Sequence, residues 1–144
     1  DASRLELLRA ARAEQSKFPV LAIDDMEASV RTAEMVRKHF PNLRILARAR
    51  NRRHVFLLKE LGVEVVIRET LYSSLRLAED LLQELGMQQQ AIARTVSMFQ
   101  KYDEELLERQ SAVFRDDAKL VQTSKEAAAE LEQLLQEDRR QAAG

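Results

Sequence analysis

Up to residue 86, short apolar runs alternate with stretches in which apolar residues recur every three or four positions. The short runs predict strands over residues 20–23, 43–47 and 63–67, and the third run is rich in β-branched residues. The longer stretches predict helices, each of which begins at a residue that can cap a helix N-terminus: Asp1 or Ser3, Asp25, Asn51 and Thr70. Gly62 and Gly86 are expected to end the third and fourth of these helices.

Helices that alternate with short apolar strands are typical of βαβ units in a parallel sheet. Three strands are few for such a sheet, and no strand precedes the first predicted helix. The expected fold class is therefore α/β: the C-terminal half of a Rossmann-like, doubly wound parallel sheet, followed by long α-helices. The other half would hold a glycine-rich turn, so either the sequence is part of a longer domain or a partner supplies the remaining strands.

From residue 88 the pattern becomes purely helical. Positions spaced 4-3-4-3-4-3 predict a seam that packs on another helix or a sheet, formed by Ile92, Val96, Phe99, Asp103, Leu106, Gln110 and Val113. A charge on such a seam is costly unless it is paired or binds a ligand. Asp103 therefore lies at a ragged edge, pairs with an arginine, or marks a polar site at an interface. A last amphipathic helix is expected to place Leu120, Ala127, Leu131 and Leu134 on one stripe.

Composition narrows the classes of function. The 144 residues are 45% hydrophobic, which is too apolar for a disordered chain. Cysteine is absent, histidine occurs only at positions 39 and 54, and none of the three glycines forms a Gly-x-Gly motif. Disulfides, thiolate metal sites, cysteine nucleophiles and a phosphate-binding glycine loop are therefore excluded within this sequence. No apolar run approaches the roughly 20 residues of a membrane span, and no signal-peptide pattern is present. The composition points away from an enzyme.

Charge is distributed unevenly along the chain. Residues 1–60 contain 13 Lys or Arg and 8 Asp or Glu, whereas residues 61–144 contain 10 and 16. Residues 35–59 carry eight basic residues and no acidic one. Such a stretch binds an anion, faces an acidic protein surface, or is a solvated face that the acidic second half partly neutralises. If it bound nucleic acid, binding would depend steeply on salt, and the acidic second half argues against that role.

Charged residues also follow each predicted strand, at the edge where open parallel sheets bind ligands. They are Asp24 and Asp25 after the first strand, Arg48, Arg50 and Asn51 after the second, and Arg68 and Glu69 after the third. Arginine binds carboxylate or phosphate through two parallel hydrogen bonds, so these positions suit an anion. Alternatively, Arg68 simply pairs with Glu69 or Asp24. Asp24 and Asp25 could serve acid–base chemistry, but Asp25 is better explained as a helix cap.

Several phrases of the sequence together resemble one family. They are Asp1-Ala-Ser-Arg-Leu-Glu-Leu-Leu, Asp24-Asp25-Met-Glu-Ala-Ser, Ala33-Glu-Met-Val, His39-Phe-Pro-Asn-Leu, Leu46-Ala-Arg-Ala-Arg-Asn51, Leu61-Gly-Val and Arg68-Glu-Thr70. The chain resembles the cytosolic regulatory domain of glutathione-gated potassium-efflux antiporters of the Kef type, which belongs to the KTN/RCK, or TrkA-N-like, class. The resemblance spans nearly the whole chain and weakens after about residue 115.

The resemblance implies a partial Rossmann-like KTN/RCK domain over residues 1–86 and a helical dimerisation and regulatory extension over residues 87–144. It also implies a homodimer on the cytoplasmic side of a bacterial inner membrane, beneath the membrane antiporter domain of the parent protein. In some relatives an ancillary flavoprotein docks on this domain. Glutathione holds such a system closed, and glutathione adducts open it.

The resemblance further implies where ligands bind. Glutathione or its adduct lies at the dimer interface near Arg68 and Asp103, and the residues expected to help hold its carboxylates or the interface are Arg48, Arg50 and Asn51. AMP or NAD lies in the Rossmann cleft, beside the positions of Asp1, Asp24 and Asp25. The sequence departs from the family in lacking the glycine-rich turn and in carrying Arg12 where relatives have glycine.

We therefore expect a ligand-sensing regulatory domain and not an enzyme, with no nucleic-acid partner. Two alternatives remain open. The chain could be a helical dimerisation scaffold without a small-molecule ligand, in which Asp103 and the arginines only set the packing register. It could also be a module that binds anions or nucleic acid through residues 35–59.

Overall fold

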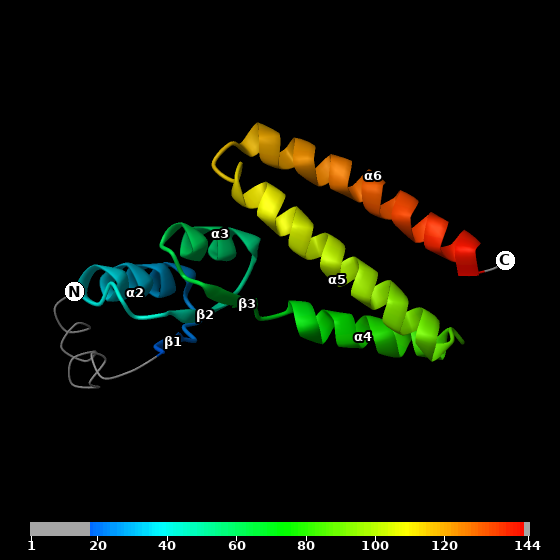
Figure 1. The fold of residues 1–144 in the computed structure, drawn as a ribbon, viewed down its shortest axis with the longest axis horizontal. Helices are drawn as coiled ribbons and strands as arrows, with labels where there is room; N and C mark the ends of the chain where they lie inside the picture. Colours follow the sequence, from blue (N-terminus) through cyan, green and yellow to red (C-terminus); the bar gives the residue numbers. More distant parts are fainter. Residues whose placement is uncertain (1–17, 143–144) are drawn as a thin grey trace. The chain divides into compact units, whose positions relative to one another are not determined.

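The computed structural model describes residues 18–142 and contains two compact units, which divide between Thr70 and Leu71 (Figure 1). The described part of the first unit consists of β1 (Val20–Leu21), α2 (Met26–His39), β2 (Leu46–Ala49), α3 (Arg52–Glu60) and β3 (Val65–Arg68). The second unit consists of α4 (Leu71–Glu84), α5 (Gln89–Ser111) and α6 (Asp117–Ala142). The division that we predict after residue 86 follows a change of sequence pattern and stays a prediction, whereas packing groups α4 with α5.

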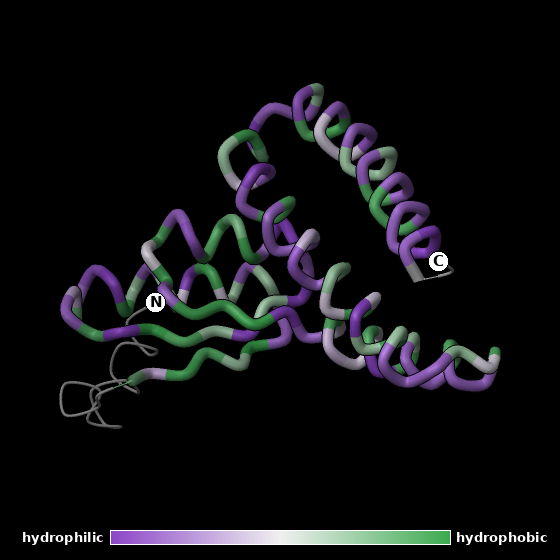
Figure 2. Tube along the Cα trace, turned by 45° about the vertical axis from the view of Figure 1, so that its right-hand side comes forward, coloured by the Kyte–Doolittle hydropathy of each residue, from purple (hydrophilic) through white to green (hydrophobic). Residues whose placement is uncertain are grey.

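The three strands form a parallel sheet in the order β1-β2-β3, as the alternating pattern predicts. Leu46 of β2 lies opposite Val20 on one side and Val65 on the other. Apart from Arg48 and Arg68, the residues of the strands are apolar, and α2 and α3 lie on the same face of the sheet (Figures 1 and 2). Two successive right-handed crossovers in one direction require this placement. The core between these layers is formed by buried residues that include Leu21, Val36, Ile45, Ala47, Ala49, Val55 and Leu58.

The strands differ in their ends from the predicted runs, and hydrogen bonds explain each difference. The second strand begins at Leu46, not at residue 43, because the Ile45 amide donates to the Glu64 carboxylate and ladder pairing starts one residue later. The third begins at Val65, because the Val63 amide donates to the Leu58 carbonyl oxygen at the end of α3. The first ends at Leu21, and the next carbonyl oxygen accepts instead from an arginine side chain.

Two of the predicted helix caps are confirmed. The Asp25 Oδ1 atom accepts from the Ala28 amide at 2.7 Å, and the Asn51 Oδ1 atom accepts from the His54 amide at 2.9 Å. These bonds satisfy amides that the first turn of a helix leaves without partners. Helix α4 begins immediately after Thr70, whose capping role stays a prediction. The cap expected at Asp1 or Ser3, and Arg12, lie outside the described residues.

Glycine ends α3 and α4 as predicted, because each chain turn requires a left-handed backbone. Gly62 has φ +73° and Gly86 has φ +82°. The amide of Gly62 donates to Lys59 and the next amide donates to Leu58; the same pair of bonds follows α4. This is the Schellman arrangement, in which a side chain at the glycine position would be strained.

The seam on α5 is broader than the seven predicted positions. Three of them, Ile92, Asp103 and Gln110, are buried, and the other four are half-buried. Tyr102 and Leu107 are buried beside them. Helix α6 lies against α5 (Figure 1).

The stripe on α6 follows the predicted positions until its last one. Ala127 is buried, and Leu120 and Leu131 are half-buried. Leu134 is exposed, which makes that part of the prediction wrong: the half-buried leucine is Leu135, four residues after Leu131. Within residues 18–142, no helix combines the length and hydropathy that crossing a lipid bilayer requires.

Candidate functional site

Four charged side chains meet at the carboxyl ends of the strands. They are Asp24, Arg48, Arg50 and Glu69, and we call them the strand-end cluster. Arg48 donates through Nη2 to the Asp24 carboxylate, and its Nη1 lies 3.8 Å from a Glu69 oxygen. The Arg50 Nε atom lies 3.7 Å from the other Glu69 oxygen. Glu69 therefore lies between two arginines, of which Arg48 is in the neighbouring strand and Arg50 directly follows it.

The backbone explains why these residues meet. Arg48 is in β2, Arg50 follows the end of that strand, and the Glu69 amide donates to the Ala49 carbonyl oxygen at 2.9 Å as the chain leaves β3. Because parallel strands end at the same edge, their following residues lie close together. The structure thus brings Asp24, Arg48 and Arg50 together at this edge, and their role in binding a ligand stays a prediction.

The cluster is open to solvent. The side chains of Arg48, Arg50 and Glu69 are 35%, 54% and 34% exposed. Exposed ion pairs contribute little, on the order of 0 to 1 kcal/mol each, so a competing carboxylate could displace one at small cost. The Arg48 Nε atom is buried and has no hydrogen-bond partner among the described residues, which leaves one donor of the cluster unused. The cluster can therefore exchange an internal carboxylate for an external one.

The remaining predicted site residues of the first unit have other local roles. Asp25 and Asn51 each use a side-chain oxygen to cap a helix. Arg68 is the last residue of β3 and lies opposite Ala49 in the ladder. Asp1 lies outside the described residues. The structure therefore groups Asp24 with Arg48 and Arg50, and it holds Asp25 and Asn51 in place as caps.

Asp103 lies in α5, in the second unit, where its side chain is 5% exposed. The adjacent Tyr102 hydroxyl lies 2.7 Å from a Glu130 oxygen and 2.9 Å from the Ala127 carbonyl oxygen. Arg109 donates to the same Glu130 oxygen at 3.0 Å, and its guanidinium lies 5.7 Å from the centre of the Tyr102 ring. The buried Asp103 is therefore adjacent in sequence to Tyr102, whose hydrogen bonds join α5 to α6.

Two pKa values in this network move in opposite directions. Burial, followed by the hydrogen bond with Glu130, raises the pKa of Tyr102. The hydrogen bonds from Arg109 and then from Tyr102 lower the pKa of Glu130. Both shifts favour a neutral phenol beside an ionised carboxylate, which is the state that the hydrogen bonds require.

Sequence reasoning missed two residues of the site region. Glu69 was expected to pair, if at all, with Arg68, and only the strand order shows that it lies beside Arg48 and Arg50. His54 is the other: it is fully buried in α3, and its Nδ1 atom accepts from the Arg50 amide at 3.2 Å. Burial lowers its pKa. The spacing of the apolar residues around it does not distinguish a buried histidine from a surface one.

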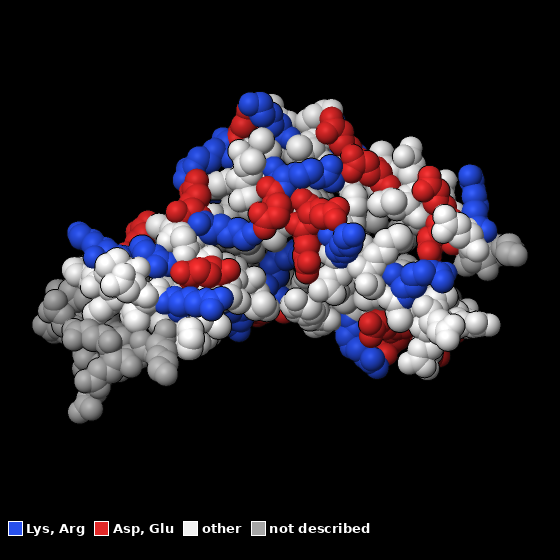
Figure 3. All heavy atoms as spheres, in the orientation of Figure 1, with Lys and Arg blue, Asp and Glu red and all other residues white. Residues whose placement is uncertain are grey.

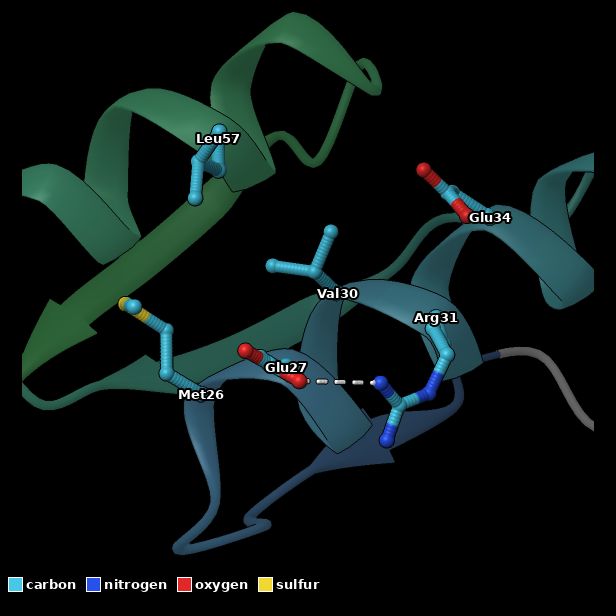
Figure 4. Close-up of a pocket in the computed structure, with 6 residues that line it drawn as sticks. All are labelled: Met26, Glu27, Val30, Arg31, Glu34 and Leu57. Carbon is cyan, nitrogen blue, oxygen red and sulfur yellow. Dashed lines mark hydrogen bonds and ion pairs between the residues drawn. The ribbon is translucent and has the colours of Figure 1, made fainter.

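A separate groove of about 220 Å³ lies between α2 and α3 (Figure 4). Its lining consists of Met26, Glu27, Val30, Arg31, Glu34 and Leu57. Its one ion pair within the lining joins Arg31 to Glu27 at 3.3 Å. None of the predicted ligand-binding residues lines this groove. Within residues 18–142, no group of three or more His, Asp or Glu side chains could hold a metal ion.

Comparison with known proteins identifies the class first. Residues 1–69 match the TrkA-N domain, and residues 73–144 match the family described as the potassium efflux system KefB C-terminal domain. The second match covers half of the chain. The chain therefore belongs to the family of C-terminal domains of Kef potassium-efflux systems, as the resemblance of its phrases predicts.

Individual relatives agree with this assignment. The glutathione-regulated potassium-efflux system proteins KefC of Escherichia coli O157:H7 and of Escherichia fergusonii are each 32% identical over 139 residues. These matches cover 96% of this chain and 22% of each relative, so the chain spans about a fifth of their length.

A solved structure described as the Shewanella denitrificans Kef CTD in AMP-bound form is 35% identical, with a TM-score of 0.74. It covers 78% of this chain and 72% of that one. The likeness confirms the α/β, Rossmann-like fold class.

Proposed function

We propose that this chain is the ligand-sensing regulatory domain of a potassium-efflux system and has no enzymatic activity of its own. The single observation that supports this most is the strand-end cluster, in which Arg48 and Arg50 converge on the solvent-exposed carboxylate of Glu69. An anion with carboxylates of its own can take that place. Glutathione carries two carboxylates at neutral pH, and the KefC relatives are described as glutathione-regulated.

The proposed glutathione site combines these arginines with residues that the family resemblance adds. Arg68 and Asp103 would contact glutathione or its adduct at a homodimer interface. Arg48 and Arg50 would bind carboxylates through their guanidinium groups. Asn51 would contribute its amide nitrogen, because its side-chain oxygen already caps α3.

A nucleotide, AMP or NAD, is the second proposed ligand, since the Shewanella relative is described as AMP-bound. Its place would be beside Asp24 and Asp25, together with Asp1. The carboxylate of Asp24 already accepts from Arg48, so nucleotide binding there would be coupled to the strand-end cluster. The glycine-rich turn that usually holds the phosphates is absent from this sequence.

We further propose that the domain acts on a membrane antiporter domain of its parent protein, on the cytoplasmic side of a bacterial inner membrane. An ancillary flavoprotein is a further proposed partner. Because a ligand shifts gating only through different affinities for two states, glutathione and its adducts must differ in their contacts. Bulk at the sulfur would meet Phe99 or Tyr102. Phe99 is half-buried, whereas the Tyr102 hydroxyl is bonded to α6.

Calorimetric titration with glutathione and with an S-substituted adduct, together with light scattering, tests this proposal. We expect a dimer that binds both with different affinities, and we expect Arg68→Ala to abolish binding without loss of helical circular dichroism. Arg53→Ala is the control, because Arg53 is an exposed arginine of the basic stretch at residues 35–59 and has no assigned place in the proposed site. Unchanged affinity in Arg68→Ala would count decisively against the proposed site.

The alternative of a dimerisation scaffold has one observation in its favour. Two leucines of α4, Leu77 and Leu81, are 72% and 58% exposed, and Leu85, directly after the helix, is 73% exposed. A well-folded dimer that binds neither glutathione nor its adduct would support this alternative. For nucleic acid, the surface offers less support: basic and acidic side chains are interspersed on the face of each unit that Figure 3 shows.

A further inference from the structure

His54 is a polar residue that the proposed site does not use, although it lies at the centre of the turn that carries the arginines. It is in the first turn of α3, with Arg52 and Arg53 beside it in sequence, and its side chain is fully buried. Its own amide donates to the Asn51 side chain at 2.9 Å. Its Nδ1 atom accepts from the Arg50 amide at 3.2 Å. The imidazole thus connects the first turn of α3 to the backbone directly after β2 through a hydrogen bond.

The bond to Arg50 defines the protonation state of the ring. An Nδ1 atom that accepts a hydrogen bond carries no proton, so the neutral ring holds its proton on Nε2. The Nε2 atom is buried and has no partner among the described residues. Adding a second proton to the ring would set an Nδ1–H donor against the Arg50 N–H donor. The observed turn therefore requires a neutral His54.

The turn in its observed form directs Arg50 towards the strand-end cluster. Arg50 directly follows Ala49, the last residue of β2, so its backbone is the first that the sheet no longer holds. The bond from its amide to His54 replaces the lost ladder bond. From that position, its Nε atom reaches to 3.7 Å from Glu69. Without the acceptor on His54, the Arg50 amide is left inside the turn with no partner, which destabilises the observed turn and favours rearrangement.

We propose that His54 is a positioning residue for the anion site: its neutral imidazole, by accepting from the Arg50 amide, holds the Arg50 guanidinium in the strand-end cluster, and protonation of the ring weakens anion binding. The proposal rests on the proposed function, because it assumes that the cluster is where the anion binds.

Within residues 18–142, no charged group on the neighbouring elements takes the place of the Arg50 amide as the hydrogen-bond partner of the His54 ring. Helix α2 brings Glu27, Arg31 and Glu34 to the groove that it shares with Leu57 of α3. The charged groups on the strands and at their carboxyl ends include the strand-end cluster and Arg68, and Glu64, which precedes β3, pairs with Arg37 at 3.6 Å. None of these groups bonds to the His54 ring. Its protonation is therefore governed by burial and by the Arg50 amide.

Two substitutions separate the acceptor from the volume of the ring. His54→Asn places Oδ1 near the position of Nδ1, so it keeps an acceptor for the Arg50 amide and cannot be protonated. His54→Phe keeps a buried ring without an acceptor. His39→Asn is the control for histidine titration in general, because His39 is exposed at the end of α2.

The experiment is titration of the full chain with reduced glutathione at about pH 7.5 and about pH 4.5, and the lower value lies well below the usual histidine range because burial lowers the pKa of His54. We expect wild-type affinity to fall at the lower pH, His54→Asn to match wild type at the higher pH and to lose most of the fall, and His39→Asn to behave as wild type. His54→Phe should bind about tenfold more weakly at both values. Equal affinity in His54→Phe and wild type, or the full pH dependence in His54→Asn, would overturn the proposal.

A second readout keeps this inference distinct from the proposed function. Hydrogen exchange of the Arg50 amide reports the bond to His54 without any ligand. We expect its protection in wild type and in His54→Asn, and its loss in His54→Phe. Failure of wild type to bind glutathione would refute the proposed function, whereas equal Arg50 protection in His54→Phe would refute the positioning role itself.

Discussion

Glu69 determines, at the scale of single residues, how available the arginines of the strand-end cluster are. Its two carboxylate oxygens lie 3.8 Å from Arg48 and 3.7 Å from Arg50. An external anion has to compete with it for the same guanidinium groups. The cluster therefore contains an internal competitor whose removal leaves the backbone in place.

We predict that Glu69→Gln raises the affinity for glutathione by about two- to fivefold, because two exposed ion pairs of small individual energy no longer compete. Titration calorimetry at one ionic strength measures the change. Glu34→Gln removes an exposed carboxylate on α2, away from the cluster, and should leave the affinity unchanged. Weaker binding by Glu69→Gln would show that Glu69 assists the anion.

The bonds around Tyr102 predict a dependence of stability on pH. The pKa of Glu130 is lowered in the folded chain from its ordinary value of 4.5. A carboxyl group with a lowered folded pKa stabilises the fold above its ordinary pKa, and that stabilisation is lost as the pH falls through the lowered value. Tyr102→Phe removes one of the two bonds that lower the pKa, so its stability should fall less steeply below pH 4.5.

Thermal unfolding of wild type and Tyr102→Phe at a series of acidic pH values measures this difference. At neutral pH the variant should be less stable than wild type, since it lacks the hydroxyl proton for which the Glu130 carboxylate and the Ala127 carbonyl oxygen are both acceptors within reach. Parallel acid profiles for the two proteins would contradict the linkage.

At the scale of helices and strands, local chemistry allowed accurate prediction wherever one residue decides the outcome. The caps at Asp25 and Asn51 and the glycine ends at Gly62 and Gly86 follow from residue type alone. The ends of the strands do not follow from residue type alone, because they depend on hydrogen bonds with residues that are distant in the sequence. The start of β2, for example, depends on a bond between the Ile45 amide and Glu64, 19 residues later.

The two glycine turns form a matched pair for measuring backbone strain. Gly62→Ala and Gly86→Ala both force alanine into a left-handed conformation, which costs about 1–2 kcal/mol. A Cβ atom at Gly86 would meet nothing within 4 Å, and one at Gly62 would lie 3.7 Å from the Arg37 guanidinium, an ordinary contact. We therefore expect similar losses of unfolding free energy in chemical denaturation. A much larger loss for Gly62→Ala would mean that Arg37 cannot adjust.

At the scale of the whole molecule, the two units carry opposite charge. Residues 1–70 contain 14 Lys or Arg and 10 Asp or Glu, and residues 71–144 contain 9 and 14. The class of the fold, the parallel sheet and the two long helices could be predicted from periodicity alone. For the strand-end cluster, the sequence predicts only the edge of the sheet at which the charged residues lie. It does not predict the ion pairs, because which arginine pairs with which acid depends on side-chain geometry.

The exposed leucines of α4 and the one directly after it predict self-association. Leu77 and Leu81 are four residues apart in α4, and Leu85 continues this spacing after the helix, where its amide still donates to the Leu81 carbonyl oxygen. Two antiparallel copies with Leu81 at the twofold axis would place Leu77 against Leu85, which makes the surface complementary to itself. We expect Leu81→Lys to shift the chain from dimer to monomer in sedimentation equilibrium. Gln83→Lys adds the same charge to an exposed position of α4 and should keep the dimer. A dimer that persists in Leu81→Lys would rule out this surface.

Arg37 joins two loops of the first unit through its side chain. It donates to the carbonyl oxygens of Pro41 and Leu43 at 3.0 and 3.2 Å, and to that of Leu61 at 3.1 Å. It also donates to the Gly62 carbonyl oxygen. The loop after α2 and the turn after α3 therefore cannot open one at a time without breaking the same guanidinium contacts. The two segments should behave as one cooperative opening unit, although about 20 residues separate them in the sequence.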